Sequence, residues 1–427
     1  MRLAARALAI LLVVAFTAAC APRPAPEPVM DADSEQAEPA DGEADESEAT
    51  DSEEQDEPEV DPELAIIRLD PNAENLDLWS ELRDTSEDPV REAGPFYINR
   101  FDQPAVHSFF GLPVALTQED LIAGNVEVAI MGAPLDMGSG MRGAKFGPRE
   151  LRSQSWAWGL PHMHVMTAWV NELVAVDYGD APIDNMSTER SMPPVRRMVR
   201  EIAETGAIPI IIGGDHSLEY PNVAAMADVY GKENVGVIHF DAHYDAGVGG
   251  SGHLISHGQP IRRLVNDGHI LGSNYIQVGL RGYWPGESGF EWMREQGMRY
   301  HPMAEIERDG WARVMERVLD EANDGPEHLY VSFDIDVIDP AYTPGTGTPE
   351  PGGLTTREVF PLIRGLCAEN NLVGFDLVEL APLIDPGYTT TLNSDRLVQE
   401  CLTGIALHKK GLDGRRYLSP LTTNDRR

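Results

Sequence analysis

The chain has 427 residues but only three cysteines, too few for a disulfide framework. No metal-ligand spacing joins Cys367 to Cys401. These two could pair in an oxidising compartment, but a pair of buried free thiols is the better interpretation. The sequence also lacks internal repeats, and no apolar run after residue 20 is long enough to span a bilayer. These absences exclude a disulfide-rich scaffold, a repeat array and a protein with several membrane spans.

Lysine and arginine are absent from residues 31–63, which contain seventeen Asp or Glu. Together with the Pro-rich segment that begins at residue 21, this stretch is predicted to form a disordered tether over 21–63, because it cannot bury enough apolar surface to fold. It carries less than half of the net charge of −37, so the body of the chain is acidic as well. An acidic body disfavours nucleic acid and suits a small cationic substrate, although ordinary solubility explains it equally well.

The N-terminus has an export pattern. Two arginines precede an apolar stretch, residues 7–19, that is too short to span a bilayer. The segment Thr17-Ala18-Ala19-Cys20 then resembles a bacterial lipobox, although Thr17 departs from the usual Leu or Val. Residues 1–20 are therefore predicted to be a signal peptide with a lipobox, and ordinary cleavage at a nearby small residue is the alternative. We expect an exported bacterial lipoprotein at the cell envelope, periplasmic or surface-facing, that contacts the membrane only through this anchor.

Past residue 64, apolar strand-like runs alternate with helical patterns, which is typical of a parallel α/β sheet. We predict an α/β protein with a three-layer α/β/α fold and a central, mostly parallel sheet. An irregular lead-in over 64–125 precedes one catalytic domain over 126–412, and 413–427 form a C-terminal tail. The candidate strands are 127–132, 172–177, 208–212, 235–241, 275–280, 329–335 and 372–378. The candidate helices are 191–205, 219–231, 287–297, 304–323 and 356–370.

Three short polar motifs follow three of these apolar runs. They are Gly213-Gly214-Asp215-His216-Ser217, Asp241-Ala242-His243-Tyr244-Asp245 and Asp334-Ile335-Asp336. In an open parallel sheet, the carboxyl ends of the strands are where ligands bind. Two histidines and four aspartates are too many ligands for one small divalent ion, but they suit a pair of ions that share bridging carboxylates. The motifs therefore indicate a hydrolase with a two-metal site.

Each of these residues also has an ordinary interpretation. A single His216 or His243 is more often a satisfied buried histidine, and an aspartate after a strand is often a helix N-cap. However, the ligands recur at period two after buried strands, where they would face one side and repel each other without cations. A set rich in oxygen and free of cysteine favours Mn²⁺, with Ni²⁺, Co²⁺ or Fe²⁺ as alternatives, over a thiolate zinc site.

With these motifs, the chain resembles the ureohydrolases, the arginase and agmatinase family, across roughly 125–410. Ser332-Phe333-Asp334-Ile335-Asp336-Val337-Ile338-Asp339-Pro340 extends the third motif. Pro344-Gly345-Thr346-Gly347-Thr348-Pro349 and Gly352-Gly353-Leu354 resemble the family's active-site loop, and Met137-Gly138 with Lys145-Phe146-Gly147-Pro148 resembles its amino-terminal signature. The resemblance implies the fold that arginases share with deacetylases and a homo-oligomer, trimeric or hexameric.

The resemblance also implies two Mn²⁺ per chain, with Ni²⁺ or Co²⁺ as alternatives. One ion would be held by His216, Asp241, Asp245 and Asp334. The other would be held by His243, Asp241, Asp334 and Asp336, so that Asp241 and Asp334 bridge the pair.

Three residues receive further roles from the resemblance. Glu379 would grip the substrate guanidinium through paired hydrogen bonds, and Asp336 would relay a proton to the leaving nitrogen. His257 would bind near the substrate and exchange that proton with solvent. Without the family, His257 is more simply a surface loop histidine. Glu379 is then a strand-end surface residue, although the apolar run before it favours an inward position.

The substrate is predicted to be a small cationic guanidino compound. Gly247 stands where arginases have an asparagine, so its loop offers little to bind an α-carboxylate. The segment 277–282 is closer to agmatinases and guanidinobutyrases, and agmatine suits the acidic body. Tyr244 is bulkier than usual at its position and could narrow the pocket, which would select guanidine or a short guanidino acid. Tyr283 and Trp284 either line the outer pocket or pack under the loop.

Agmatine hydrolysis to putrescine and urea is therefore the expected activity. Guanidinobutyrase, guanidinopropionase and guanidine hydrolase are alternatives within the family. A deacetylase-like enzyme shares the architecture but uses a single Zn²⁺, which the six ligands argue against. A surface binding protein that keeps its metals without turnover is disfavoured because His257 and Glu379 are both present. A two-metal phosphatase or nuclease is disfavoured because no Arg or Lys cluster accompanies the ligands.

Overall fold

The structure is a computed structural model, which describes residues 107–412 except 137–142, 155–158, 185 and 250–252. The chain divides into two units, 1–71 and 72–427, and all described residues belong to the second. The predicted signal peptide, tether and C-terminal tail lie outside the described residues, as do Met137-Gly138 and most of the lead-in. Within the described ranges, no helix combines the length and apolar character that a membrane crossing requires.

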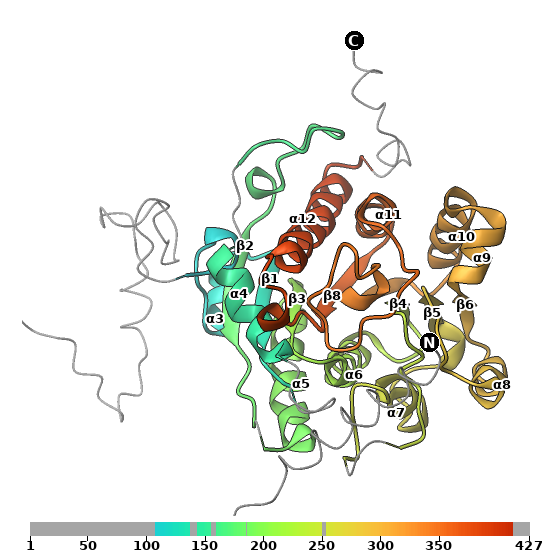
Figure 1. Cartoon of the computed structure of the whole chain (residues 1–427). Coiled ribbons are helices and arrows are strands. Elements are labelled where there is room, and N and C mark those ends of the chain that lie inside the picture. Colours follow the sequence, from blue (N-terminus) through green and yellow to red (C-terminus); the bar gives the residue numbers. More distant parts are fainter. Residues whose placement is uncertain (1–106, 137–142, 155–158, 185, 250–252, 413–427) are drawn as a thin grey trace, which may run out of the picture. The chain divides into compact units, whose positions relative to one another are not determined.

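Eight parallel strands form one central sheet, which confirms the predicted α/β class (Figure 1). The order across the sheet is β2-β1-β3-β8-β7-β4-β5-β6. The strands are β1 (Val128–Ala133), β2 (Ala175–Asp180), β3 (Ile208–Gly213), β4 (Val235–Phe240), β5 (Tyr275–Val278), β6 (Arg299–His301), β7 (His328–Asp334) and β8 (Leu372–Val378). The short strand β6 at one edge was not predicted.

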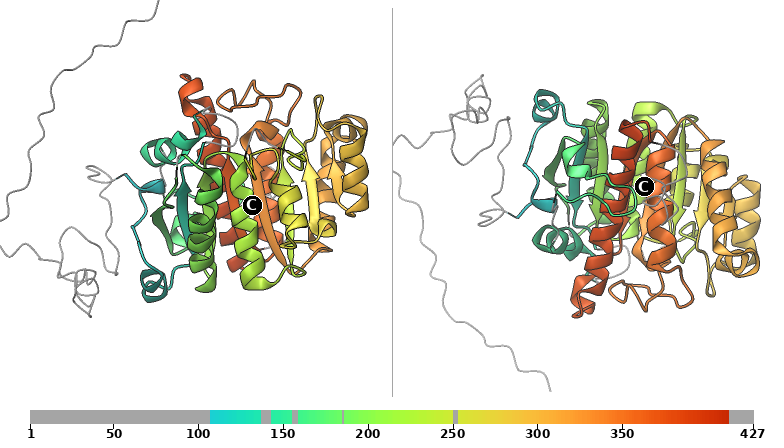
Figure 2. Two further views of the ribbon diagram at one scale, coloured as in Figure 1. Left: turned by 90° about the horizontal axis from the view of Figure 1, so that it is seen from below. Right: turned by 90° about the horizontal axis from the view of Figure 1, so that it is seen from above.

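Helices cover both faces of the sheet, so the three-layer prediction is also confirmed (Figure 2). Successive strand residues point to opposite faces: Ile210 and Ile212 belong to one core, and Ile211 to the other. One face packs against α4 (Gly147–Gln154), α9 (Met303–Asp309), α10 (Trp311–Asn323), α11 (Thr356–Glu369) and α12 (Thr389–Lys409). The other packs against α3 (Gln118–Ala123), α5 (Thr188–Glu204), α6 (Glu219–Tyr230), α7 (Pro260–Asn266) and α8 (Glu287–Glu295).

Local sequence explains several helix boundaries. Thr117 is the N-cap of α3 and Thr355 the N-cap of α11, and each forms a capping box that satisfies free backbone N–H groups at the start of the helix. The predicted helix 304–323 is instead two helices, because Gly310 between them has φ +84°, which favours glycine. The lead-in prediction also needs correction at its end, since α3 is a regular helix that contributes buried Leu121 to the core.

Cys367 of α11 and Cys401 of α12 form a disulfide bond, so the prediction of free thiols is wrong. The two helices lie side by side on one face of the sheet (Figures 1 and 2). Gly404 allows this close approach, because a Cβ at that position would lie 2.7 Å from the Cβ of Cys367. The pairing depends on which helices pack together, and cysteine spacing in the sequence does not contain that information.

The strands that precede the polar motifs are neighbours at the centre of the sheet, in the order β3-β8-β7-β4. Because all four are parallel, their carboxyl ends lie at the same edge. His216 follows β3, Glu379 follows β8, Asp334 ends β7 and Asp241 follows β4. The topology thus brings together groups that are up to 163 positions apart in the sequence.

Candidate metal centre

His216 forms the middle of the first ligand group. Its Nδ1 lies 3.1 Å from Oδ2 of Asp241, 3.1 Å from Oδ2 of Asp245 and 3.2 Å from Oδ2 of Asp334. All four side chains are buried. The predicted first ligand set is therefore assembled around one imidazole nitrogen.

The other nitrogen of His216 fixes the ring for metal binding. Nε2 lies 2.9 Å from Oγ of Ser332, and this hydroxyl donates to Oδ1 of Asp376 at 2.8 Å. Since the hydroxyl proton is used, Ser332 accepts a hydrogen bond from Nε2–H, which leaves the lone pair of the neutral ring on Nδ1. That lone pair faces the three aspartates, as a metal ligand requires.

His243 belongs to the second ligand group. Its Nδ1 lies 3.2 Å from Oδ1 of Asp241 and 2.9 Å from Oδ2 of Asp336. Asp241 thus presents Oδ2 to His216 and Oδ1 to His243, which is the arrangement expected of a bridging carboxylate. For Asp334, Oδ2 faces His216, and Oδ1 accepts from the backbone N–H of Asp336 at 2.8 Å.

The backbone brings these ligands together in a different way from the predicted strand alternation. Strand β4 ends at Phe240, and Asp245 has φ +47°, a left-handed conformation that is rare outside glycine and common at functional sites. Asp336 lies in a 3₁₀ turn that Asp334 caps. The ligand side chains are therefore brought together by turns and not by extended strands. The chain folds back at the edge of the sheet, so that the ligands surround the same point.

The centre has an excess of negative charge. Burial raises the pKa of Asp245 to about 6, helped by the charge of Asp241. Burial and the charges of Asp336 and Asp241 raise the pKa of Asp334 well above its usual range. Burial opposes charge on His243, but Asp336 and Asp241 raise its pKa to about 12. These shifts show that the group attracts positive charge, and a hard, oxygen-rich donor set with imidazole nitrogens fits divalent cations of the Mn²⁺ type.

Glu379 lies beside the first ligand group with one oxygen left free. Its Oε1 accepts from the backbone N–H of His216 at 3.1 Å and lies 3.2 Å from Nδ1 of His257. Its Oε2 is buried and has no hydrogen-bond partner within the described part of the chain. Glu379 also has φ +61°, and such strain persists only when the surroundings hold the residue in place. Oε2 of Glu379 is therefore available to bind a ligand.

His257 connects this carboxylate to solvent. A quarter of its side chain is exposed, whereas Glu379 is almost completely buried. Burial opposes charge on His257, but the hydrogen bond and charge of Glu379 raise its pKa to about 9. The structure therefore brings both predicted residues to the site, joined by a hydrogen bond between His257 and Glu379.

Arg281 holds the active-site loop against the centre. Within the described residues, its guanidinium donates to backbone carbonyls, those of Gly279, Asp336, Val337, Glu350 and Pro351, at 2.6–3.3 Å. Within the same loop, Thr348 Oγ1 lies 3.3 Å from Oδ2 of Asp336. The predicted loop thus lies next to a predicted ligand.

Tyr244, which was predicted to narrow the pocket, packs in the core. Its side chain is buried in the core, where Arg262 Nη2 donates to its hydroxyl at 3.1 Å and its ring packs edge-on against Trp284. Trp284 lies over the loop: a Cβ at Gly247 would be 3.3 Å from its ring, and one at Gly258 would be 3.5 Å away. The indole is partly exposed, whereas Tyr283 is fully exposed. Trp284 therefore packs against the loop that contains Gly247 and against Gly258, the residue after His257, and remains partly exposed.

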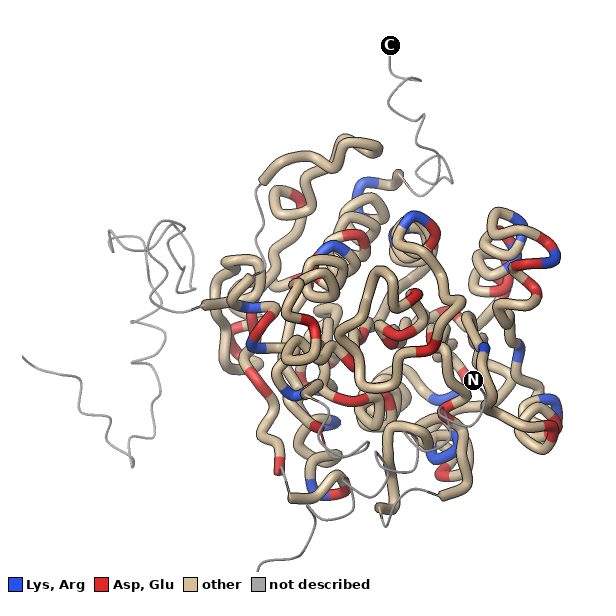
Figure 3. The backbone as a smooth tube through the Cα atoms, viewed as in Figure 1, with Lys and Arg blue, Asp and Glu red and all other residues tan. Residues whose placement is uncertain are grey.

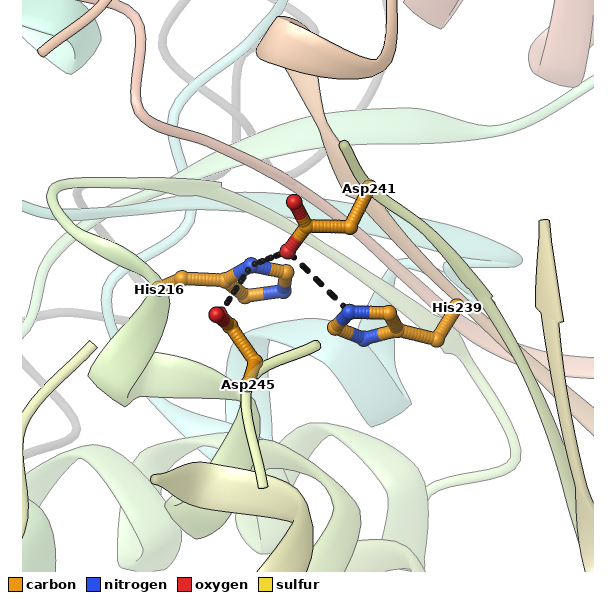
Figure 4. Close-up of side chains that lie close together, drawn as sticks. All are labelled: His216, His239, Asp241 and Asp245. Atoms are coloured by element: carbon orange, nitrogen blue, oxygen red, sulfur yellow. Dashed lines mark hydrogen bonds and ion pairs between the residues drawn. The ribbon is translucent and has the colours of Figure 1, made fainter. Parts of the chain in front are cut away.

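His239 is a further polar residue at the centre, which was not predicted from the sequence (Figure 4). Ligand atoms of His216, His239, Asp241 and Asp245 all lie within 4.8 Å of one another, as do those of Asp241, His243 and Asp336. His239 lies near the end of β4 and precedes Asp241 by two residues, and its Nε2 lies 3.1 Å from Oδ2 of Asp241. The period of two that indicated the later ligands could have included it.

A parallel α/β/α sheet with two histidine–aspartate groups at its carboxyl edge defines the class of hydrolases that depend on two metal ions. The family model described as "Arginase family" matches residues 126–404, and the chain belongs to this family. It is 37% identical to the mitochondrial agmatinase of Gallus gallus over 70% of this chain and 85% of that protein. It is 36% identical to the guanidinobutyrase of Pseudomonas aeruginosa over 65% of this chain and 86% of that protein.

Solved structures show the same relationship. The proclavaminate amidino hydrolase of Streptomyces clavuligerus superposes with a TM-score of 0.63 at 31% identity, covering 71% of this chain and 98% of that one. Shared identity of this size over nearly whole domains confirms the predicted family and the predicted arginase-like fold.

Proposed function

We propose that this guanidino hydrolase of the arginase family converts agmatine to putrescine and urea with the aid of two Mn²⁺ ions. The observation that carries the proposal is the free Oε2 of Glu379, a buried carboxylate oxygen beside the ligand group. A guanidinium is planar and offers parallel N–H donors, which suit a carboxylate better than any other side chain. Binding there would place the guanidinium carbon next to the metal centre.

The first ion would be held by His216, Asp241, Asp245 and Asp334, and the second by His243, Asp241, Asp334 and Asp336. Ni²⁺ and Co²⁺ are alternatives, because the same mixed oxygen and nitrogen ligands bind them. When bound, such a pair supplies a water nucleophile at neutral pH and stabilises negative charge in the transition state.

The residues of the chain would orient the substrate and move protons. Glu379 fixes the guanidinium plane, so that a single face of its carbon is open to attack. Asp336 relays a proton to the leaving nitrogen, since its Oδ2 lies among polar partners at the centre, 2.9 Å from His243 and 3.3 Å from Thr348. His257, exposed on one side and bonded to Glu379 on the other, exchanges that proton with solvent.

The outer site favours a substrate with a cationic tail. Arg281 is committed to backbone carbonyls, so it would not bind a tail carboxylate. Arg262 donates to Ala246 O and the Tyr244 hydroxyl and lies over the ring of Trp292. The partly exposed indole of Trp284 offers a surface that attracts cations. Nearby, a Cβ at Gly282 would lie within 3.1 Å of both carboxylate oxygens of Glu350, so a negative charge borders this region.

A guanidino acid is the second candidate substrate, because the guanidinobutyrase of Pseudomonas aeruginosa is a relative at 36% identity. Guanidinopropionate and guanidine are further alternatives. The charge of the outer site argues for agmatine over both acids.

Urea release by the full chain loaded with Mn²⁺ tests the proposal. The panel comprises agmatine, 4-guanidinobutyrate, 3-guanidinopropionate, arginine and guanidine, with Asp241→Ala as the inactive control. Metal-dependent release from agmatine in preference to the acids is expected. Faster release from an acid would replace the proposed substrate. Silence across the panel with two ions bound would favour a binding protein that has lost turnover.

We also propose that the enzyme is exported and anchored as a lipoprotein through Cys20. The buried disulfide between Cys367 and Cys401 supports this location, because such bonds persist mainly in oxidising compartments. Expression in a bacterium should place the protein in the membrane fraction, and Cys20→Ser should release it. Release of the unchanged chain into the soluble fraction would contradict the anchor. A trimer or hexamer is expected, and light scattering of the purified protein measures this.

A further inference from the structure

His239 of β4 is buried beside the metal centre, yet the proposed mechanism gives it no role. Its Nε2 lies 3.1 Å from Oδ2 of Asp241, and its Nδ1 lies 3.1 Å from Oε1 of Glu219. Its ring stacks on that of His216 with centroids 4.6 Å apart and planes 3° from parallel. Figure 4 shows the two parallel imidazoles and the carboxylate of Asp241 that both contact.

Glu219 holds the far side of this imidazole. It is the first residue of α6 and is completely buried, although a buried carboxylate is costly without partners. Besides His239, the hydroxyl of Tyr275 on the neighbouring strand donates to the same Oε1 at 3.4 Å. A continuous chain of contacts therefore runs from α6 through Glu219 and His239 to Asp241.

The contacts favour His239 as a hydrogen-bond donor to Asp241. Each of its ring nitrogens faces a carboxylate oxygen, and an ionised carboxylate can only accept. The ring is thus held between two acceptors, and with a proton on Nε2 this nitrogen donates to Oδ2 of Asp241. His216 differs, because only its Nδ1 faces carboxylates while its Nε2 bonds to the Ser332 hydroxyl.

We propose that His239 is a positioning residue that orients the bridging carboxylate of Asp241, with Glu219 fixing His239 in turn. The proposal rests on the two-metal centre of the proposed function. Rotation of the Asp241 carboxylate would move Oδ2 away from the first ligand group and Oδ1 away from the second. The Nε2–H bond opposes this rotation, so that a single hydrogen bond supports both ion sites.

Two substitutions separate the hydrogen bond from the space that the ring fills. His239→Phe keeps a flat ring that stacks on His216 but removes both donors. His239→Gln places an amide N–H near the position of Nε2 and so restores the bond to Asp241. Glu219→Gln keeps an oxygen acceptor for Nδ1 and removes only the charge.

His301 provides a matched control. It is also a buried histidine between two carboxylates, 2.9 Å from Oε2 of Glu305 and 3.1 Å from Oε2 of Glu321, but it touches no metal ligand. His301→Phe removes the same kind of bonds away from the centre. This variant therefore measures how much stability is lost when a buried histidine with two hydrogen bonds is removed away from the metal centre.

The readout is Mn²⁺ affinity, measured by titration calorimetry on the metal-free full chain with Mn²⁺ alone. Loss of a residue that orients a ligand costs about 10–100-fold in metal affinity, and this loss is expected for His239→Phe. His239→Gln should recover most of it, Glu219→Gln should lose several-fold, and His301→Phe should match the wild type.

Wild-type affinity in His239→Phe would overturn the proposal, as would equal losses in His239→Phe and His301→Phe. If His239→Phe fails to fold, the comparison of His239→Gln with Glu219→Gln still decides: an affinity for His239→Gln below that of Glu219→Gln would contradict a positioning bond. Substrate identity does not enter the readout. Two tightly bound ions without urea release would therefore reject the proposed function and leave the role of His239 intact.

Discussion

Two clusters of buried charge in this molecule are built in opposite ways. Between α11 and α12, the carboxylate of Glu400 is surrounded by Arg364, Arg396 at 2.7 Å and His162 at 3.1 Å. Burial alone would raise the pKa of Glu400, but the hydrogen bond with His162 and the charges of the arginines lower it to about 2. We call these four residues the α11–α12 charge cluster. Its negative charge is fully compensated by the chain itself.

The metal centre has the reverse balance. Four aspartates and Glu379 converge on two histidine ligands, and the pKa of Asp334 is raised by burial and by neighbouring aspartates. Figure 3 shows acidic positions at the centre of the view, and mixed acidic and basic positions on the outer helices α9 and α10, where Arg317 pairs with Asp309. Buried charge alone therefore does not mark a functional site. A buried cluster in which charges of one sign exceed those of the other is the stronger indication of a functional site.

The largest expected effect is on activity. Asp241→Ala removes a carboxylate that faces both ligand groups, and kcat/KM with Mn²⁺ should fall at least about a thousand-fold, because bound ions supply several kcal/mol of transition-state stabilisation. Asp228→Ala, at a half-exposed aspartate that pairs with Arg196, is the control and should retain full activity. Retention of more than a tenth of the activity by Asp241→Ala would contradict a two-metal centre.

Stability should respond with opposite signs in the two clusters. Glu400→Ala leaves Arg364 buried without its carboxylate and should lower the free energy of unfolding by about 3–5 kcal/mol. Asp334→Asn relieves repulsion between aspartates, so it should leave the metal-free protein unchanged or more stable. Urea denaturation of the metal-free proteins measures both. A destabilisation of similar size in the two variants would show that the two clusters do not differ in how their charge is compensated.

Acid should weaken the α11–α12 charge cluster specifically. The pKa of Glu400 is about 2 in the folded chain against an ordinary value of 4.5. A depressed pKa gives stability that is fully present above pH 4.5 and is lost as the pH falls towards 2. The free energy of unfolding of the wild type should therefore fall across this range relative to Glu400→Gln. Parallel curves for the two proteins would contradict the assignment.

Metal addition should stabilise the centre without involving the other cluster. At a Mn²⁺ concentration about 100 times Kd, each ion should add about 2.7 kcal/mol to the free energy of unfolding. Glu400→Ala should gain the same amount as the wild type, since its cluster contains no metal ligand. Thermal unfolding with and without Mn²⁺ makes the comparison, and a reduced gain in Glu400→Ala would show that the clusters are coupled.

The smallest effect is expected at the rim of the centre. Trp284→Ala removes the aromatic surface of the outer site, and KM for agmatine should rise about threefold to tenfold with little change in kcat. Tyr283→Ala is the matched control, since that side chain is fully exposed. A fall in kcat with unchanged KM would place Trp284 in the chemistry instead of the recognition of the tail.

Much of the centre could be predicted because its metal-binding residue types occur together in short sequence motifs. Aspartate and histidine after an apolar run conflict with burial unless something binds them, and this conflict is visible at Asp241 and Asp334. His239 was missed because a single histidine inside an apolar strand looks like ordinary core. The turn at Asp334–Asp336 could not be told from a strand, since both place side chains two residues apart.

The rest depends on packing that no local pattern records. Helix α12 was missed because its second half is buried on all sides, residues 400–407 included, so its apolar residues do not form a single stripe. The α11–α12 charge cluster joins His162 to Glu400, 238 positions away, and no motif links them. The disulfide was missed for the same reason, since it requires knowing that α11 and α12 are neighbours.

The strand order also has a consequence for how the enzyme is made. Within the described residues, β3 pairs with β1 and β8, and β7 pairs with β4 and β8, so β8 alone joins the two halves of the sheet. Yet β8 is the last of these described strands to be synthesised. A nascent chain that ends before Leu372 holds the motifs of all six predicted ligands but not the strand that brings His216 to Asp334. Assembly of the centre must therefore wait for nearly the whole chain, which makes metal capture a late event in the life of the molecule.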